Sequence, residues 1–252
     1  MNILQISIQA PGYNSGGTLG ILQFSYALTR NNKVTYIGPK IESEDIEPWF
    51  EKTIYMSRKL TLVEKLQSLM HMEFDKYYIL WNKIDINFND YDVIYIDFTR
   101  WQYVVKSIKK SGYKGKIIVR AHNVEKDYLR VEYKSKRTIS SYIKSILAGH
   151  REKYMVNMAD MILAITPEDK KRLIDLYKVE EQKIVVCPVG VNSSKCRKKK
   201  SVEKGQKLNC LITGSLWFGP NATGALWVLK EVMPKVSDIC ELTIAGANPN
   251  ND

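Results

Sequence analysis

Few of the residues that build disulfides or metal sites occur in this chain. Cysteine is found four times in 252 residues, no Cys-x-x-Cys pair is present, and the first 186 residues contain no cysteine. A disulfide framework would leave most of such a chain without a crosslink, so reduced thiols in a cytoplasmic protein are expected. The chain has only three histidines, and no cysteine or histidine spacing matches a zinc site. No metal is therefore predicted.

Long apolar runs are also missing. No stretch approaches the roughly 20 apolar residues that cross a bilayer, and the N-terminus lacks the positive start of a signal peptide. Residues 2–8 instead have the composition of a strand. With 44% hydrophobic and 26% charged residues, the chain is neither disordered nor fibrous.

The excess of basic over acidic residues is confined to the middle of the chain. The net charge is +11, and residues 101–200 hold 24 basic and 10 acidic side chains. Such an excess attracts polyanions, namely nucleic acid, anionic lipid or phosphorylated small molecules. No helix-turn-helix or RNP motif accompanies it, so nucleic acid is the least favoured of these partners.

Strand-like and helix-like segments alternate along the sequence, which is typical of an α/β fold with a doubly wound parallel sheet. We expect the first helix to bury Leu19, Leu22, Ala27 and Leu28, or similar positions at helical spacing. Strands are predicted at residues 2–8, 34–37, 93–96, 117–121, 161–165 and 184–186. Helices are predicted at about residues 18–30, 62–70, 102–110 and 137–158, and from Pro167 onward behind a Thr166 cap.

Two domains and a linker are expected. Residues 1–192 form a Rossmann-like domain, and the basic, unpatterned residues 193–206 read as a linker. Residues 207–252 then restart the pattern with one strand–helix–strand unit. Because a single βαβ unit cannot bury its own apolar face, we expect the second domain to be truncated at residue 252.

A glycine-rich turn joins the first predicted strand to the first predicted helix. Gly16 and Gly17 permit close backbone approach, and the helix start offers free N–H groups to an anion such as a phosphate. The turn is neither Gly-x-Gly-x-x-Gly nor a P-loop. The residues alone leave an anion site and a plain tight turn equally open.

A histidine follows directly on a predicted strand within residues 120–125. His122 should therefore lie at the carboxyl edge of the sheet, where open α/β folds bind ligands. There it could act as a hydrogen-bond donor or general base, or it could be a packed structural histidine. Its neighbours Arg120 and Asn123 share this edge, whereas His71 and His150 are interpreted as structural.

A second strand–turn–helix junction occurs at Gly214 and Ser215. Its backbone N–H groups could help to hold a phosphate, although a plain connecting turn is the alternative. The sequence contains no Gly-x-Ser-x-Gly elbow, paired-carboxylate motif or zinc-deaminase motif.

Taken in order, these segments resemble the nucleotide-sugar glycosyltransferases of the GT-B fold, specifically family 4. The resemblance spans almost the whole chain. It rests on Gly16–Gly17 and on residues 120–125, 159–166, 188–192, 214–221, 224–227 and 233–234.

This resemblance implies two Rossmann-like domains facing a cleft, transfer with retention of anomeric configuration, and no metal or cofactor beyond the nucleotide-sugar co-substrate. Gly16 and Gly17 would approach the donor phosphates or the acceptor, and Gly214 and Ser215 would line the phosphate side. His122 would lie by the reacting sugar. The acceptor-side candidates are Asn14, Arg120 and Asn123. A saccharide or lipid-linked acceptor and a role in cell-surface polysaccharide synthesis are implied as well.

The sequence departs from the family pattern in two places. The Arg and Lys that many relatives carry after the Gly-Ser turn are replaced by residues 217–220, an aromatic–proline variant. The donor-binding Glu-x7-Glu region would fall beyond Asp252. A non-catalytic binding module, or a remnant of such an enzyme, is therefore the alternative function.

The basic middle of the chain suggests a membrane contact. We expect its lysines and arginines to lie on one face of the first domain and to meet anionic lipid, each contributing about 1 kcal/mol. This would place the protein in the cytoplasm, with peripheral attachment at the inner membrane face; ordinarily solvated helices are the alternative. The residues are Lys106, Lys109, Lys110, Lys114, Lys116, Lys134, Lys136, Arg137 and Lys144.

Overall fold

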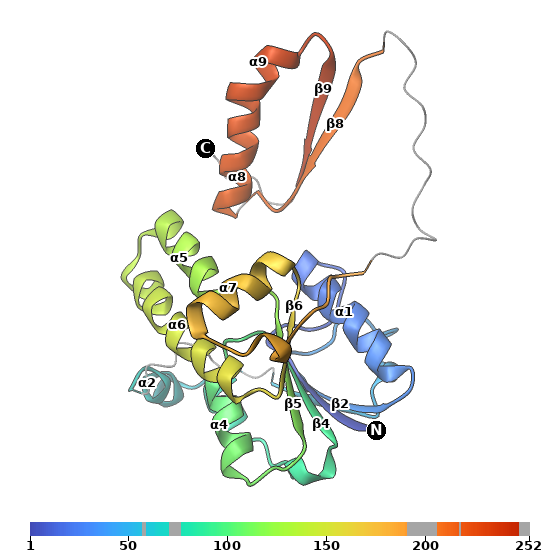
Figure 1. Cartoon of the computed structure of the whole chain (residues 1–252), viewed down its shortest axis with the longest axis vertical. Helices are drawn as coiled ribbons and strands as arrows, with labels where there is room; N and C mark the ends of the chain where they lie inside the picture. Colours follow the sequence, from blue (N-terminus) through green and yellow to red (C-terminus); the bar gives the residue numbers. More distant parts are fainter. Residues whose placement is uncertain (57–58, 71–76, 191–205, 217, 247–252) are drawn as a thin grey trace. The chain divides into compact units, whose positions relative to one another are not determined.

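The computed structural model (Figure 1) describes residues 1–56, 59–70, 77–190, 206–216 and 218–246. The chain divides into two compact units, Met1–Arg130 with Thr138–Val191, and Val131–Arg137 with Asn192–Asp252. The predicted linker, residues 193–206, lies outside the described residues except for Gln206.

A parallel seven-stranded sheet forms the centre of the first unit, with the order β3–β2–β1–β4–β5–β6–β7. The strand order reverses beside β1, which lies between β2 and β4. This confirms the predicted doubly wound α/β fold and places the switch point, where such folds bind ligands, between β1 and β4. The strands are β1 (Asn2–Ile6), β2 (Lys33–Gly38), β3 (Lys52–Tyr55), β4 (Val93–Asp97), β5 (Lys116–Ala121), β6 (Met161–Ala164) and β7 (Ile184–Val186).

Helices cover both faces of this sheet (Figure 1). The predicted helices are confirmed, whereas α3, α5 and strand β3 were not predicted. Helix α5 is polar and lacks a clear apolar period, and α3 and β3 are only five and four residues long. The helices are α1 (Gly16–Thr29), α2 (Leu62–Met70), α3 (Tyr77–Trp81), α4 (Gln102–Lys110), α5 (Glu125–Lys136), α6 (Ile139–Met158) and α7 (Pro167–Tyr177), with short 3-10 turns at Glu47–Trp49, Phe88–Asp90 and Glu181–Lys183.

Helix α1 starts earlier than its sequence suggests, and its buried face matches the expected one only in part: Leu22 is buried and Leu28 half-buried, whereas Ala27 is exposed. It begins at Gly16 because Ser15 and Thr18 form a capping box, with Ser15 Oγ accepting from the Thr18 N–H at 3.2 Å and Thr18 Oγ1 accepting from the Ser15 N–H at 2.9 Å. The side facing the sheet includes Gly20 and Ser25, while Leu19 is 37% exposed. The expectation that Leu19 is buried was therefore wrong.

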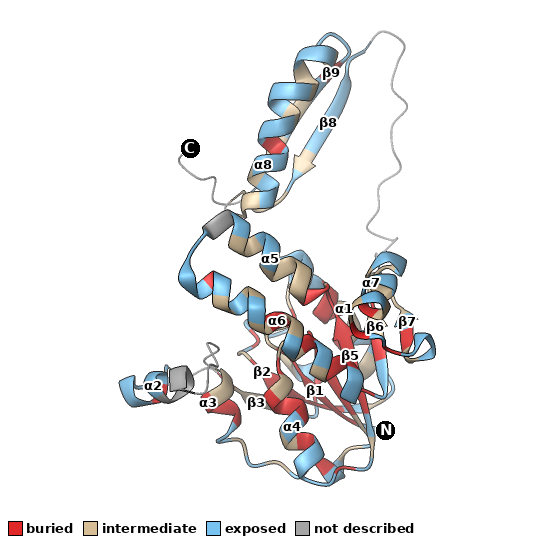
Figure 2. Cartoon of the chain, turned by 60° about the vertical axis from the view of Figure 1, so that its left-hand side comes forward, coloured by how far each residue is buried: buried red, intermediate tan, exposed pale blue. Residues whose placement is uncertain are grey.

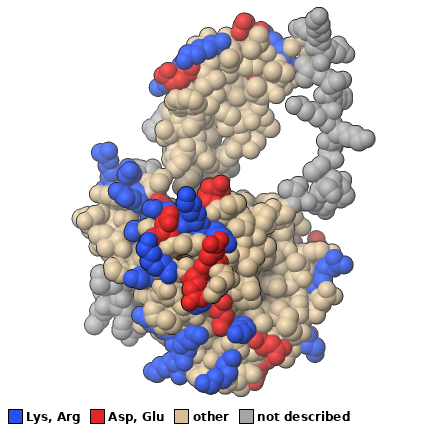
Figure 3. All heavy atoms as spheres, viewed as in Figure 1, with Lys and Arg blue, Asp and Glu red and all other residues tan. Residues whose placement is uncertain are grey.

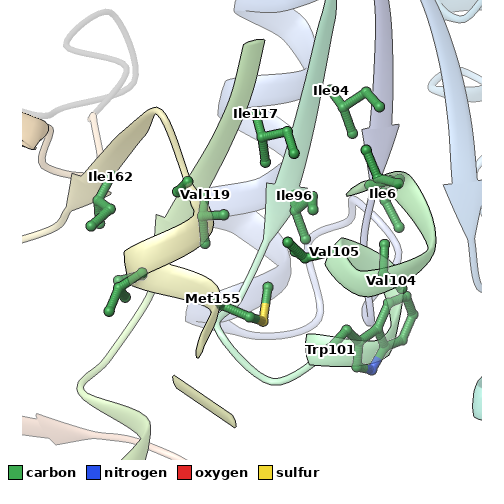
Figure 4. Close-up of a cluster of buried hydrophobic side chains, with 14 of the residues drawn as sticks. Ile6, Ile94, Ile96, Trp101, Val104, Val105, Ile117, Val119, Met155 and Ile162 are labelled. Atoms are coloured by element: carbon green, nitrogen blue, oxygen red, sulfur yellow. The ribbon is translucent and has the colours of Figure 1, made fainter. Parts of the chain in front are cut away.

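The alternation of side chains along the buried strands builds two cores, one on each face of the sheet. Figure 4 shows the larger one, where Ile94 and Ile96 of β4 pack with helix α4 and with Met155 of α6. The opposite face carries a smaller core that includes Tyr95 of β4 and Leu22 of α1. Figure 2 shows the buried residues concentrated along the strands and on the helix sides that face them.

One buried carboxylate on α6 connects this helix to α5 and α7 through hydrogen bonds. Glu152 of α6 is fully buried, and its oxygens accept from the backbone N–H groups of Glu125 (2.8 Å) and Lys126 (3.1 Å) at the start of α5. They also accept from the Thr99 hydroxyl at 2.9 Å and the Tyr177 hydroxyl at 2.6 Å. Burial raises the pKa of Glu152, partly offset by these four donors.

The second unit contains strands β8 (Leu208–Thr213) and β9 (Cys240–Ala245), which pair in parallel. Between them run α8 (Gly219–Trp227), a π-helical turn (Val228–Val232) and α9 (Met233–Val236). As expected for one βαβ unit, large apolar side chains stay exposed, among them Leu211 (63%) and Trp227 (59%).

Three of the four cysteines lie within the described residues, and all three, Cys187, Cys210 and Cys240, are free thiols. No helix in the described part of the chain is long and apolar enough to span a bilayer.

The Glu152 network predicts a large stability effect. Replacement of Glu152 by Ala leaves two backbone N–H groups and two hydroxyls without their buried acceptor, so we expect the free energy of unfolding to fall by about 3 kcal/mol. The matched control is Lys153→Ala on the exposed side of the same helix, which should change it by less than about 0.5 kcal/mol. Equal denaturation midpoints for the two variants in urea would contradict the assignment.

Candidate active site

Polar side chains interrupt the apolar strands at alternate positions on the face that α1 covers. Gln5 of β1 lies in register with Tyr95 of β4, and Asp97 at the end of β4 lies in register with Arg120 of β5. Because side chains two residues apart share a face, His122 continues the line of Arg120 beyond the strand. The sheet therefore collects five polar groups at its carboxyl edge, beside the switch point.

The Asp97 carboxylate lies at the centre of this group and is completely buried. Its Oδ2 accepts from Gln5 Nε2 at 3.1 Å, and its Oδ1 accepts from the Tyr95 hydroxyl at 3.1 Å. Gln5 is held in turn by Ser25 of α1, whose Oγ lies 2.9 Å from Gln5 Nε2. Burial and the charge of Asp97 raise the pKa of Tyr95 well above its usual value, so Tyr95 stays a hydrogen-bond donor.

His122 is attached to this carboxylate from the end of β5. Its Nε2 lies 3.1 Å from Asp97 Oδ1, and only 5% of its side chain is exposed. The Phe98 ring stacks on the imidazole with centroids 4.0 Å apart and an interplanar angle of 15°. Phe98 has a φ of 74°, a backbone conformation that costs a bulky residue about 1–3 kcal/mol.

Arg120 is completely buried beneath helix α1. Its Nη1 donates to the carbonyl of Gly20 at 3.0 Å, and its guanidinium lies 3.6 Å from the ring centroid of Phe24. Nε and Nη2 have no hydrogen-bond partner among the described residues. A Cβ at Gly20 would lie 3.9 Å from Nη2 and 3.8 Å from His122 Cε1, which places this position of α1 directly over both residues.

The predicted anion site at the start of α1 has a defined geometry. Gly16 and Gly17 are the first two helical residues rather than part of a turn, because Ser15 is the cap. Their N–H groups have no acceptor among the described residues, and the space beside Gly16 is open. A Cβ at Gly17 would lie 3.0 Å from Gln9 Oε1. The helix dipole adds partial positive charge at this end.

In the second unit, Gly214 and Ser215 form the turn between β8 and α8. The Gly214 N–H donates to the Ala245 carbonyl at 3.1 Å, and Asn221 Nδ2 donates to the Ser215 carbonyl at 3.1 Å. A Cβ at Gly214 would lie 2.8 Å from Asn221 Nδ2, so the turn requires a small residue. These two residues belong to the second unit, whereas His122 belongs to the first.

The structure thus brings His122 and Arg120 together beneath α1. Asn123 beside them is half-buried, and Asn14, before the helix, is exposed. His150 is exposed on α6, and His71 lies outside the described residues. The sequence reading missed Asp97, Gln5 and Tyr95. Polar residues at alternate positions of apolar strands were the signal that could have found them.

The sequence was compared with models of known protein families. The sequence profile of Glycosyltransferase Family 4 matches residues 15–195, which include α1, Asp97 and His122. The chain belongs to glycosyltransferase family 4. It is therefore a glycosyltransferase, as the resemblance in the sequence implied. A search of curated proteins gives no match.

Solved structures similar to this family 4 chain are glycosyltransferases with the GT-B fold. The lipopolysaccharide outer core galactosyltransferase WaaB has a TM-score of 0.58 at 15% identity, covering 98% of this chain and 68% of that one. Sucrose-phosphate synthase from Thermosynechococcus elongatus has a TM-score of 0.59 at 12% identity, covering 98% and 71%. HepE of Anabaena, in complex with UDP and glucose, has a TM-score of 0.52 at 11% identity, covering 97% and 68%. At these identities the comparison establishes the fold.

The buried charges of Asp97 and Arg120 predict a coupled effect on stability. They lie side by side on neighbouring strands and share Tyr95, so Asp97→Asn or Arg120→Met alone leaves the other charge uncompensated. Each single variant should lose about 3–5 kcal/mol of unfolding free energy. The double variant should lose at least about 1 kcal/mol less than the sum. Additive losses in a double-mutant cycle would show that the two charges do not interact.

Proposed function

We propose that this glycosyltransferase moves a sugar from a nucleotide-sugar to a saccharide or lipid-linked acceptor, with retention of configuration, in cell-surface polysaccharide synthesis. The observation that carries the proposal is the buried Asp97–His122 pair at the carboxyl edge of the sheet, close to α1, in a family 4 chain. The presence of UDP and glucose in the structure of HepE supports a nucleotide-sugar donor.

The reaction breaks the bond between the anomeric carbon and the nucleotide diphosphate, and forms a bond from that carbon to an acceptor hydroxyl oxygen. Negative charge develops on the departing diphosphate, and the acceptor hydroxyl loses its proton. Donors aimed at the developing charge lower the barrier. The free N–H groups of Gly16 and Gly17 supply such donors in the first unit. In the second unit we assign Gly214 and Ser215 to the phosphate side, where Gly214 shapes the turn because its own N–H donates to the Ala245 carbonyl.

His122 is the proposed catalytic residue. Asp97 accepts the hydrogen on Nε2, so Nδ1 is left as an acceptor for a sugar hydroxyl or its proton. Arg120 is buried and supports α1 and the network, and its positive charge lies below the helix. Asn14 and Asn123 are assigned to the acceptor side, since both are at least partly exposed.

This function predicts that His122 is required for transfer. With a panel of UDP- and GDP-sugars and saccharide acceptors, His122→Ala should lower the transfer rate about 100-fold or more. The matched control, His150→Ala, removes an exposed histidine outside the network and should keep full activity. Transfer that is unaffected in His122→Ala would overturn the catalytic assignment. Donor binding without any transfer by the wild-type chain would favour a non-catalytic binding module.

We further propose that the protein is cytoplasmic and attaches peripherally to an anionic membrane surface. The nine basic residues that the sequence places on one face come from two stretches of the chain. The first stretch runs from α4 to the start of β5 and contains Lys106, Lys109, Lys110, Lys114 and Lys116. The second runs from the end of α5 into α6 and contains Lys134, Lys136, Arg137, which lies between the two helices, and Lys144. Figure 3 shows basic side chains gathered at the left and lower margins of one face, with acidic ones between them.

Exposed apolar side chains share helix α6 with Lys144. Ile139 (81%), Tyr142 (49%) and Ile146 (50%) follow one side of the first two turns of α6. Apolar residues flanked by Lys and Arg are typical of helices that lie in an anionic bilayer interface. In the first stretch, by contrast, Lys116 is paired with Asp160 at 3.4 Å. The start of α6 is therefore the surface that we assign to the membrane.

Removal of Arg137 and Lys144 together should weaken binding to vesicles that contain anionic lipid by about 10-fold or more. The matched control, Lys109→Ala with Lys110→Ala, removes two exposed lysines from α4 and should bind as the wild type does. Co-sedimentation that is independent of anionic lipid content, or equal losses in the two double variants, would exclude this surface.

A further inference from the structure

The stack of Phe98 on His122 depends on an unusual backbone. Phe98 follows β4 directly and has a φ of 74°, in the left-handed region that bulky side chains rarely adopt. Its N–H donates to the Arg120 carbonyl at 2.9 Å, which continues the β4–β5 ladder by one residue. Strain of this kind persists only where the surroundings over-determine it, and it gathers at functional sites.

The ring of Phe98 is fixed from more than one direction. It is only 4% exposed and lies against the imidazole of His122 over its face. The Arg100 guanidinium carbon lies 5.8 Å from the centre of the same ring, and Arg100 Nε donates to Glu125 Oε2 at 2.7 Å. Glu125 begins α5, so the start of that helix holds the arginine beside Phe98.

Two constraints therefore act on the His122 imidazole. The hydrogen bond to Asp97 holds one ring nitrogen. A single hydrogen bond resists rotation about the Cβ–Cγ bond only weakly, and such a rotation would turn the ring away from the carboxylate. The parallel stack at 4.0 Å fixes the plane. A carboxylate oxygen can only accept, so the nitrogen facing Asp97 carries the hydrogen. Nδ1 has no hydrogen-bond partner in the described part of the chain.

We propose that Phe98 is a positioning residue. Its strained backbone places its ring on His122, and the ring holds the imidazole as the Nε2–H tautomer, with Nδ1 as the free acceptor. The assignment of Nδ1 to a sugar substrate rests on the proposed function; the positioning of the ring does not. Phe98 itself touches no reacting atom in this scheme.

The test is a long-range proton–nitrogen NMR spectrum of the labelled full chain without substrate, which reads the tautomer of each histidine. The chain has only three histidines, and His71→Gln and His150→Gln identify the His122 signals by elimination. We expect the wild type to show the Nε2–H tautomer at His122. Phe98→Leu, which keeps apolar volume but loses the flat ring face, should show both tautomers in comparable amounts.

Two matched variants separate positioning from a general loss of core packing. Phe88→Leu removes a buried ring that stacks on Trp81 and should leave the His122 signals unchanged. Phe98→Tyr retains the ring and should keep the single tautomer. A single Nε2–H tautomer in Phe98→Leu would overturn the proposal, as would an Nδ1–H tautomer in the wild type. If the wild type shows the expected tautomer but transfers no sugar, the proposed function is contradicted and the positioning role of Phe98 is not.

The backbone part of the proposal has a separate readout that does not depend on the histidine. Glycine adopts a φ of 74° without strain and alanine does not, so Phe98→Gly should have a higher thermal midpoint than Phe98→Ala. At an ordinary strand or helix position the order is the reverse. A lower midpoint for Phe98→Gly would show that the left-handed backbone at this position is not strained.

Discussion

The buried carboxylate of Asp97 is the group on which the arrangement of the site depends. It ends β4 and accepts hydrogen bonds from β1 through Gln5, from its own strand through Tyr95 and from the end of β5 through His122. A buried carboxylate is tolerated only when such donors surround it. The order of the strands supplies these donors, since β1, β4 and β5 are neighbours at the switch point of the sheet.

The same network links the interior of the sheet to helix α1. Ser25 holds Gln5, and Arg120 donates to the carbonyl of Gly20, so two turns of α1 are tied to the polar face of the strands. This places the start of the helix, with the free N–H groups of Gly16 and Gly17, at the edge that holds His122. A glycosyl transfer needs both features, because positive potential must meet the departing diphosphate while an acceptor group meets the sugar hydroxyl.

Much of the scaffold and part of the site follow from the sequence alone. Apolar strands alternating with amphipathic helices predict the doubly wound sheet, and His122 directly after a strand predicts its place at the carboxyl edge. The polar residue types of Asp97 and Gln5 at alternate strand positions mark them as candidates, but their contact with each other and with His122 does not follow, since strand register and neighbour order are long-range properties. The face that α1 buries was mispredicted in part, for a related reason. Two of its four buried positions, Gly20 and Ser25, are not apolar, because they meet a polar strand face. The left-handed backbone of Phe98 has no signal in the sequence at all.

The most direct test of this account is the response of His122 to a nucleotide-sugar in the full chain. When UDP-sugars and GDP-sugars are titrated into labelled protein together with an acceptor, the account predicts that the Nδ1 signal of His122 shifts while Nε2 keeps its hydrogen. The backbone amides of Gly16 and Gly17 should shift in parallel, and His150 should not respond. If the signals of His122 and of both glycine amides do not change at saturating donor and acceptor, the claim that this edge of the sheet is the active site is contradicted.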